Sequence, residues 1–490
     1  MPDHPADPFA APSAPAVPLG TGPDGTTVVN GESLEPVLVY GVPRSGKSRG
    51  LCVPAIRDWP GPVVATSVRT DLVDLTGQAR RRLGPVFVVD PSGGTAHADA
   101  AGWDPVSACG SWAAAVATAD AMARGSGVTG TNDGYWNDQA GSLLAVLFRA
   151  ANATGRGIGQ VVTWLALGRE ADGRDGPPRR AAGRAAGRGT DADRVAWQHR
   201  HDAVLGRLDT GGLTDEQRRR AHARWLAANP APPVPPPGPL RHREGVEAAL
   251  RGEPEAWAQA QGIWHGDGRT LAITLSVART VLAACRSPAA VEAAEAGAFD
   301  PDVLLEAWGT AYLTAPPHDQ KQYASIFVAV VERVLAAAYR RDALARFADP
   351  LLVVLDEAAN IAPLRDLDVL ATTAAGSGIQ LVTVWHSHSQ LVHRYGRAAA
   401  DAIAAAHPVV VALPGQRDAL TLASLDAATG GEPVVGFDGP RGSPWRSVPE
   451  RHAVVVRGTD PPVLTDLRND HLHGPDPAVQ PPITGIGQYL

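Results

Sequence analysis

Seven short apolar runs, rich in β-branched residues, constrain the fold of this chain more than any other feature. They lie near the two ends of the sequence, and the middle has almost none. Each run is nearly unalternated and is bounded by Gly, Pro or a polar residue, which is typical of strands buried on both faces of a parallel sheet. The runs occupy residues 35–40, 62–67, 85–90, 351–356, 379–385, 408–413 and 452–457.

The stretch between the two groups of runs is rich in Ala, Leu and Arg at helical spacing. We therefore predict an α/β domain with a mostly parallel central sheet, split by an inserted all-α domain. The first part of the α/β domain is expected at 35–109, the insertion at 110–345 and the second part at 346–470.

Four segments lack a folding pattern. Residues 1–34 are rich in Pro and Ala, so we predict a disordered N-terminal tail. Residues 471–490 are expected to form a C-terminal tail. Inside the insertion, the low-complexity stretches at 171–193 and 228–241 are predicted to be exposed loops.

Composition narrows the class of protein. The net charge of −7 argues against a surface that binds nucleic acid everywhere, but it permits local basic patches. Cys52, Cys109 and Cys285 lie far apart and form no CxxC pair, so we expect a reduced, cytoplasmic protein. No run of about 18 apolar residues and no signal peptide is evident, so no intrinsic transmembrane segment is expected.

The segment GVPRSGKS at 41–48 fits the GxxxxGK[ST] motif and directly follows the predicted strand at 35–40. Lys47 is one of only two lysines in a chain that otherwise uses arginine. A compact ammonium group suits the β- and γ-phosphates of ATP better than a planar guanidinium, and the Ser48 hydroxyl is predicted to bind Mg²⁺. The predicted nucleotide-binding residues are Gly41, Pro43, Arg44, Ser45, Gly46, Lys47, Ser48 and Arg49. Pro54 is expected to kink or end the following helix after about two turns.

The segment LLVVLDEAAN at 351–360 has a Walker B pattern: an apolar strand followed by two acidic residues. Asp356 is predicted to hold the Mg²⁺ shell, and Glu357 to polarise the attacking water as a general base. The alternative is an ordinary strand that ends in a solvated acidic turn.

A third polar cluster, WHSHSQ at 385–390, follows the next predicted strand. His386 is the candidate sensor of the γ-phosphate. One rival interpretation is a metal site formed by His386, His388 and His393, although no nearby Cys or acidic residue supports it. The other is that these polar residues cap the next helix.

With these motifs, the sequence resembles the coupling ATPases of conjugative type IV secretion, the TraG/TraD family. The resemblance rests on GVPRSGKSRG, PVVATSVRTDL, VFVVDPSG, GYWNDQA, the block from LLVVLDEAANIAPL to HSHSQL, and VVVRGTDPPVL. It implies a RecA-like P-loop motor that works as a ring, a hexamer, with ATP at subunit interfaces. It also implies a DNA substrate delivered with a bound relaxase, and it assigns Lys47 and Ser48 to the nucleotide and Asp356 and Glu357 to hydrolysis.

Three departures from this family stand out. Its members usually carry N-terminal membrane helices and none is evident here, so the interpretations are a soluble member, a truncated member or one anchored by a membrane-protein partner. They usually have Gln where His386 stands, which suggests slowed or regulated hydrolysis. No arginine finger is evident, and the candidates are Arg365, Arg394, Arg397 and Arg417.

Two purely basic stretches, 179–188 and 218–224, suit non-specific contact with a DNA backbone, although a solvated Arg-rich face explains them as well. The preferred function is an ATP-driven translocase for DNA or a nucleoprotein. The alternatives are a coupling ATPase for protein substrates and a slowly hydrolysing, nucleotide-gated docking module.

Overall fold

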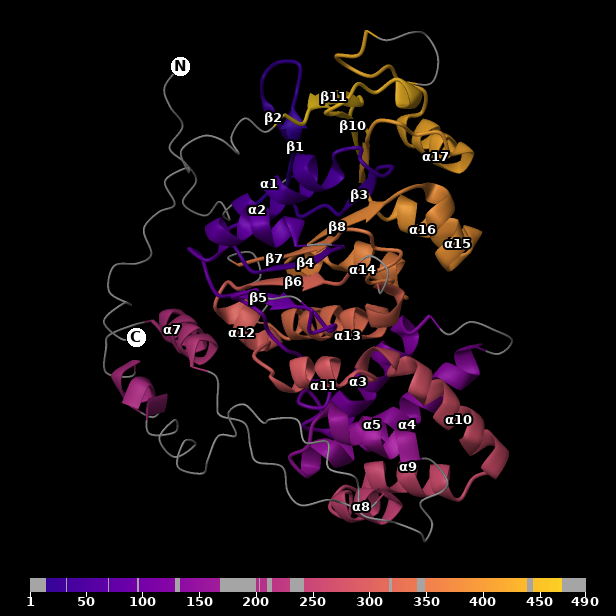
Figure 1. Ribbon diagram of the computed structural model, residues 1–490. Helices are drawn as coiled ribbons and strands as arrows, with labels where there is room; N and C mark the ends of the chain where they lie inside the picture. The colour runs from indigo at the N-terminus through magenta and orange to yellow at the C-terminus, as the bar shows by residue number, and fades with distance from the viewer. Residues whose placement is uncertain are drawn as a thin grey trace.

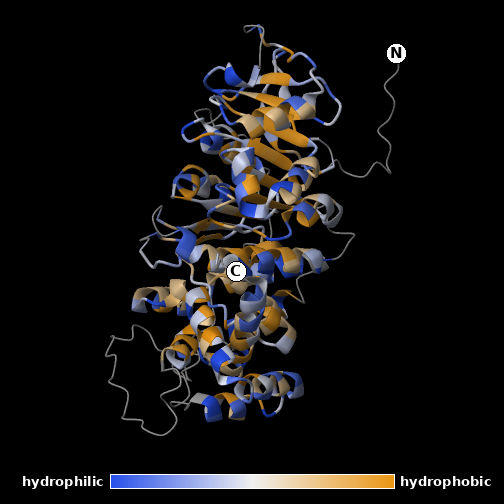
Figure 2. Ribbon diagram, turned by 90° about the vertical axis from the view of Figure 1, so that its right-hand side faces the viewer, coloured by the Kyte–Doolittle hydropathy of each residue, from blue (hydrophilic) through white to orange (hydrophobic). Residues whose placement is uncertain are grey.

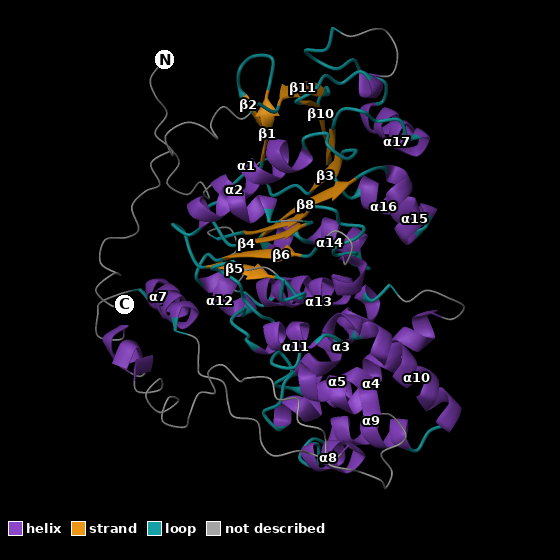
Figure 3. Ribbon diagram, in the orientation of Figure 1, coloured by secondary structure: helices purple, strands orange, loops and turns teal. Residues whose placement is uncertain are grey.

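The computed structural model describes residues 15–468, except 32, 69, 95–96, 128–132, 168–199, 202, 209–213, 230–241, 317–319, 342–348 and 439–443. The predicted loop at 171–193, most of the loop at 228–241, the basic stretch at 179–188 and the C-terminal tail at 471–490 lie outside these residues. A sheet domain and a helical lobe are stacked end to end (Figures 1 and 3).

The sheet has eleven strands in the order β2-β1-β11-β10-β9-β3-β8-β7-β4-β6-β5. The strands from β9 to β5 are parallel to their neighbours, whereas β2, β1, β11 and β10 pair antiparallel at one end. The strands are β1 Pro18–Thr21, β2 Thr27–Val29, β3 Val37–Tyr40, β4 Val63–Ser67, β5 Val86–Val89, β6 Thr310–Thr314, β7 Leu351–Leu355, β8 Ile379–Trp385, β9 Val409–Ala412, β10 His452–Arg457 and β11 Val463–Asp466.

All seven predicted strands are present, as β3, β4, β5, β7, β8, β9 and β10. Nearly all of their side chains are buried, as expected for strands covered on both faces, and Figure 2 shows hydrophobic colour along the strands. The predicted mostly parallel sheet in an α/β domain is therefore confirmed.

Helices cover both faces of the sheet. On one face, α1 (Val53–Asp58) and α2 (Asp71–Arg80) pack on alternate strand residues in one apolar cluster. The other face packs on α12 to α17, and its cluster continues into the helical lobe. These helices are α12 Pro301–Glu306, α13 Gln320–Tyr339, α14 Leu367–Thr373, α15 His388–Tyr395, α16 Arg397–Ala405 and α17 Ala419–Thr429.

The helical lobe lies below the sheet domain in Figure 1 and interrupts the chain between β5 and β6. It contains α3 Trp112–Gly125, α4 Asp133–Ala153, α5 Ile158–Leu167, α8 His242–Ala249, α9 Pro254–Trp264, α10 Gly268–Val281 and α11 Pro288–Glu295. The helix α7 (Asp215–Ala228) lies apart from it, against the sheet domain, where the Arg220 guanidinium pairs with Asp349 at 2.6 Å and stacks 4.0 Å from the Trp308 ring.

Two boundaries differ from prediction. Residues 18–29, assigned above to a disordered tail, form β1 and β2, because their backbone groups pair with each other and with β11. The strand β6, inside the predicted insertion at 110–345, inserts between β4 and β5. The chain therefore returns to the sheet domain near residue 300, before the expected boundary.

The helix α13 covers the sheet after β6. Among the described residues it is the one helix long and apolar enough to cross a membrane, but 72% of its most apolar window is buried inside the fold. Its hydropathy is thus explained by its position in the core.

The helix after the phosphate loop changes from a π-helical turn to an α-helix at Val53, one residue before Pro54, and ends at Asp58. A π-helical turn at Ser48–Cys52 precedes it, and the Val53 N–H bonds to the carbonyl of Ser48, five residues back. This wider turn moves aside the carbonyl that the proline ring would contact in a regular α-helix.

Candidate active site

The three predicted polar segments follow three neighbouring parallel strands. The strand β8 lies between β3 and β7, so the loops after them open at the same edge of the sheet. Such an edge is where α/β sheets bind ligands. The structure therefore brings together the phosphate loop after β3, the acidic pair after β7 and His386 after β8.

The phosphate loop has the backbone of an anion-binding turn. Arg44 has a φ of +67° and Gly46 a φ of +92°, while Lys47 is right-handed. Alternation of backbone hand is typical of concave nests of N–H groups that bind anions. The positive φ at residue 46 favours glycine, and at Gly41 a Cβ would lie 2.7 Å from Leu413.

Lys47 is buried and points to the other two loops. Its Nζ lies 3.1 Å from Glu357 Oε1 and 3.2 Å from His386 Nδ1. A buried ammonium group needs such partners, because desolvation without them costs several kcal/mol. The predicted loop residue Ser45 is partly buried, whereas Pro43, Arg44, Gly46 and Arg49 are exposed around it.

Glu357 and His386 form a second, direct contact. His386 Nε2 lies 2.9 Å from Glu357 Oε2, and its Nδ1 lies 3.2 Å from the carbonyl oxygen of Gly41. The His386 backbone N–H donates to Gln390 Oε1 at 2.9 Å, which fixes the corner between β8 and α15. Glu357 has a φ of +59°, an uncommon conformation for a non-glycine residue that turns the chain directly after β7.

These contacts shift the pKa values of His386 and Glu357 in opposite directions. The hydrogen bond to Glu357 raises the pKa of His386 above its usual range. Burial alone would raise the pKa of Glu357, but its contacts with His386 and Lys47 outweigh burial and lower that pKa. The carboxylate of Glu357 is therefore ionised across the neutral range.

Asp356 and Ser48 form the other half of the site. The Ser48 hydroxyl donates to Asp356 Oδ2 at 2.8 Å, and the Thr66 hydroxyl donates to the Asp356 backbone carbonyl at 2.8 Å. Burial raises the pKa of Asp356, although its contacts with Ser48 and Lys47 oppose that shift. Among the described residues, Asp356 Oδ1 is buried without a hydrogen-bond partner. A hydroxyl and a carboxylate with a spare oxygen are hard ligands of the kind that Mg²⁺ prefers, so these residues fit that ion.

Neither alternative interpretation of the histidine cluster accounts for His386. Within the described ranges, no group of three His, Cys, Asp or Glu residues is placed to hold a metal ion. His388 contacts Tyr40 and Asp401 instead of His386. Helix capping is real but belongs to Ser387, whose hydroxyl accepts the N–H of Gln390.

The four arginine-finger candidates lie on the segments that follow β7, β8 and β9: Arg365 before α14, Arg394 on α15, Arg397 on α16 and Arg417 before α17, next to Gln416, which donates to the Tyr40 carbonyl at 3.0 Å. Arg397 pairs with Asp401 at 2.7 Å, and Arg365 and Arg417 are exposed on other loops. The sequence also left two contributors unnoticed. Thr66 bonds to the Asp356 carbonyl, and Gln390 accepts the backbone N–H of His386. A single Thr or Gln in a sequence does not indicate which residue its side chain will contact.

Two family models match the sequence. The model described as "Type IV secretory system Conjugative DNA transfer" matches residues 9–176 and includes the phosphate loop. The model described as "TraM recognition site of TraD and TraG" matches residues 350–435 and includes Asp356, Glu357 and His386. No curated protein sequence matches the chain.

Several solved structures resemble the fold. The bacterial conjugative coupling protein TrwBdeltaN70, in its unbound monoclinic form, is 16% identical with a TM-score of 0.48, covering 92% of this chain and 88% of that one. The plasmid coupling protein TrwB in complex with ADP and Mg²⁺ is 17% identical with a TM-score of 0.48, covering 94% and 96%. VirB4 of Thermoanaerobacter pseudethanolicus is 11% identical with a TM-score of 0.41, covering 96% and 100%.

These identities are too low to transfer the role of any single residue, so residue roles follow from the geometry of the site. The first match covers the part of the sheet domain that carries the phosphate loop and continues through α5 of the helical lobe, and the second covers the part that carries Asp356, Glu357 and His386. The chain belongs to the coupling protein family of conjugative type IV secretion.

Proposed function

We propose that this protein is an ATP-hydrolysing translocase that moves DNA, or DNA with a bound relaxase, to a conjugative secretion channel. The observation that supports it is the meeting of Lys47, Glu357 and His386 beside the Ser48–Asp356 pair. Family membership supplies the substrate class.

In this proposal the phosphate loop binds the triphosphate of ATP through its backbone N–H groups. Lys47 exchanges Glu357 for phosphate oxygens, because a triphosphate offers its ammonium group more negative charge than one carboxylate. Ser48 Oγ and Asp356 would hold Mg²⁺, which would supply positive charge to the triphosphate.

Glu357 then serves as the general base. Its carboxylate accepts a proton from water as the water oxygen bonds to the γ-phosphorus. The bond from that phosphorus to the bridging oxygen breaks, and ADP leaves with the electron pair. His386 orients Glu357 and contacts the γ-phosphate.

The assembly is proposed to be a ring, a hexamer, with ATP at subunit interfaces and the helical lobe facing the nucleoprotein. The location is the cytoplasm, at a membrane-protein partner. The basic stretch at 218–224 is the described candidate for contact with DNA. Two of its arginines already have partners in the fold: Arg220 bonds to Asp349 and Arg224 to the Leu83 carbonyl. These two therefore anchor α7, and Arg219, which is exposed, is the better candidate for a phosphate contact.

A second candidate function is a slowly hydrolysing docking module. The ion pair between His386 and Glu357 favours it, because a paired carboxylate with a lowered pKa is a weaker base. A coupling ATPase for protein substrates is the third, supported by the acidic net charge.

Steady-state ATP hydrolysis at increasing protein concentration, with and without single- and double-stranded DNA, tests these proposals. The matched variants are Lys47→Ala and Lys321→Ala, since Lys321 is exposed on α13 and is the only other lysine. A motor requires a rate that rises cooperatively with protein and with DNA, is abolished in Lys47→Ala and is unchanged in Lys321→Ala. Binding of ATP without turnover supports the docking module, and turnover indifferent to DNA supports protein substrates.

A further inference from the structure

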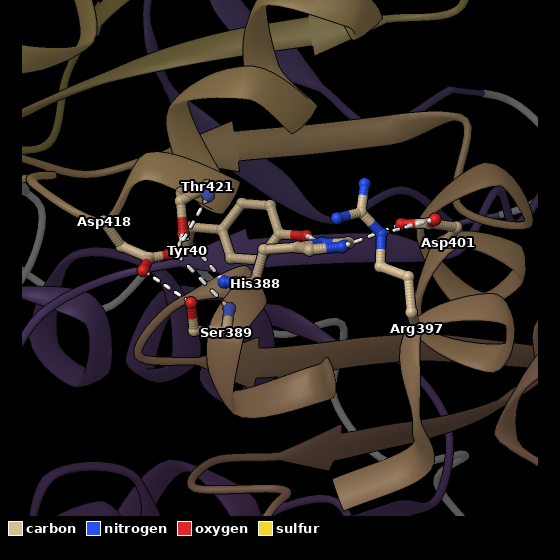
Figure 4. Close-up of polar contacts among 7 residues, drawn as sticks. All are labelled: Tyr40, His388, Ser389, Arg397, Asp401, Asp418 and Thr421. Carbon is tan, nitrogen blue, oxygen red and sulfur yellow. Dashed lines mark hydrogen bonds and ion pairs between the residues drawn. The ribbon is translucent and has the colours of Figure 1, made fainter. Parts of the chain in front are cut away.

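A buried chain of polar side chains runs behind the phosphate loop (Figure 4). The Tyr40 hydroxyl lies 2.9 Å from His388 Nδ1, and His388 Nε2 lies 3.0 Å from Asp401 Oδ1. Tyr40 is fully buried and His388 is 2% exposed. None of the three residues belongs to the site described above.

The outer end of this chain reaches the surface. The carboxylate of Asp401 is 49% exposed on α16, and its second oxygen accepts the Nε–H of Arg397 at 2.7 Å. The chain of hydrogen bonds thus connects the solvent to Tyr40, which directly precedes Gly41.

The geometry also sets the proton positions. Burial raises the pKa of the Tyr40 hydroxyl, which therefore stays protonated. Asp401 as a carboxylate only accepts, so His388 Nε2 donates to it, whereas the Tyr40 hydroxyl can donate to or accept from His388 Nδ1.

A separate set of bonds fixes the backbone of His388. Its N–H donates to the Thr421 hydroxyl at 2.7 Å, and Thr421 in turn donates to Asp418 at 2.8 Å. The Ser389 hydroxyl also donates to Asp418, at 2.5 Å. The first turn of α15 is thereby tied to the first turn of α17, as Figure 4 shows, and the His388 ring is held in a defined direction.

The chain matters for hydrolysis because of where its two buried members lie. Tyr40 is the last residue of β3 and precedes Gly41, whose carbonyl contacts His386. His386 directly follows β8, and His388 is the first residue of α15, two residues later. Their hydrogen bond joins the ends of β3 and β8, which bear the phosphate loop and the sensor.

We propose that His388 is a positioning residue for ATP hydrolysis, and that Tyr40, His388 and Asp401 form a relay that keeps the phosphate loop in register with His386. This inference rests on the proposed ATPase function. We expect the relay to act on kcat more than on the affinity for ATP, because its side chains lie away from Lys47 and position His386 relative to the phosphate loop. A misalignment of about 1 Å costs on the order of 100-fold in rate.

The test compares Tyr40→Phe, Asp401→Asn and the double variant, with kcat and KM for ATP and the binding of a fluorescent ATP analogue as readouts. Tyr40→Phe removes one hydroxyl and keeps the packing. Asp401→Asn replaces the charged acceptor of the His388 Nε2 proton by a neutral amide, which weakens the contact that orients the His388 ring. Asp426→Asn is the matched control, since this exposed carboxylate accepts a bond from the Trp445 ring N–H at 2.7 Å away from the site.

We expect each relay variant to lose about 10-fold or more in kcat, with KM and analogue affinity within about 2-fold of wild type. The double variant is expected to be no slower than the worse single variant, because both substitutions act on the same chain of contacts through His388. Asp426→Asn is expected to match wild type.

Unchanged kcat in the single variants, or losses that multiply in the double variant, overturn the relay while the ATPase function stands. Loss of analogue binding together with kcat assigns the residues a purely structural role and also overturns it. A wild-type protein that binds the analogue without turnover overturns both this inference and the proposed function.

Discussion

His386 Nε2 lies 2.9 Å from Glu357 Oε2 at the edge of the sheet where the phosphate loop opens. The family resemblance implies Gln at position 386, which hydrogen-bonds as a neutral group. An imidazole with a raised pKa instead forms an ion pair with the residue proposed as general base. The contact thus links the sensor position directly to the basicity of Glu357.

The first prediction concerns this pair. His386→Gln retains a hydrogen-bond donor to Glu357, so kcat for ATP is expected to stay within about 3-fold of wild type. His386→Ala removes the donor and is expected to lose on the order of 10- to 100-fold. Steady-state assays at saturating ATP measure both, and equal rates for His386→Ala and wild type would remove His386 from the mechanism.

The second prediction is the pH dependence of the same contact. The pKa of His386 is raised from 6.5, so its contribution to stability is fully present below pH 6.5 and is lost as pH rises through the raised pKa. The pKa of Glu357 is lowered from 4.5, so its contribution is present above pH 4.5 and is lost as pH falls through the lowered pKa. The difference in thermal midpoint between wild type and His386→Gln is therefore expected to be largest between pH 4.5 and 6.5. A constant difference from pH 4 to 9 would show that the pair is not ionic.

The strands that are buried on both faces could be predicted from the sequence, because each forms a continuous apolar run that is recognisable without knowing its neighbours in the sheet. The sequence missed β6, TAYLT at Thr310–Thr314, because three of its five residues are Thr or Ala and it lies in a helical region. It also missed β1, β2 and β11, which become strands only through antiparallel pairing with each other and β10.

The site shows the same division. Lys47, Ser48, Asp356, Glu357 and His386 were predicted from local motifs, and the structure places them together. The contact of Glu357 with His386 depends on β8 lying between β3 and β7, which is a property of the sheet and not of any motif. The relay residues Tyr40 and Asp401 gave no signal for the same reason.

The third prediction concerns a buried arginine that joins α2 to the sheet. Arg80 is fully buried, and its guanidinium donates to the Thr310 hydroxyl at 2.7 Å, to the Gly61 carbonyl at 2.5 Å and to the Trp59 carbonyl. Burial lowers its pKa to about 10. Arg80→Met leaves these acceptors unpaired at about 1–3 kcal/mol each, so we expect a loss of roughly 3 kcal/mol in the free energy of unfolding.

Denaturant titration measures this loss. Arg243→Met is the control, because Arg243 makes an exposed pair with Glu247 one helical turn away and such pairs contribute about 0.3–0.5 kcal/mol. If Arg80→Met and Arg243→Met unfold at the same denaturant concentration, the buried guanidinium does not stabilise the sheet domain.

The fourth prediction concerns a carboxyl group where the chain enters the helical lobe. Asp104 is 8% exposed and accepts the N–H groups of Val106 at 2.8 Å and Ile158 at 3.2 Å. A Cβ at Gly157 would lie 2.5 Å from both Asp104 Oδ2 and Glu295 Oε1, so the two carboxyl groups meet at the start of α5. Burial, with a contribution from Glu295, raises the pKa of Asp104 from 3.8 to about 7.

The sign of the effect follows from proton binding. Between pH 3.8 and about 7 the folded protein binds more protons at Asp104 than the unfolded chain does, so this residue makes stability fall as pH rises. The amide in Asp104→Asn cannot ionise, so the stability of this variant does not decrease through residue 104 as pH rises. The thermal midpoint of Asp104→Asn, relative to wild type, is therefore expected to increase from pH 4 to pH 7 and to level off above it. Asp302→Asn, at an exposed carboxylate on α12, is expected to show no such trend. A difference between Asp104→Asn and wild type that does not change with pH would mean that Asp104 titrates alike in the folded and unfolded chain.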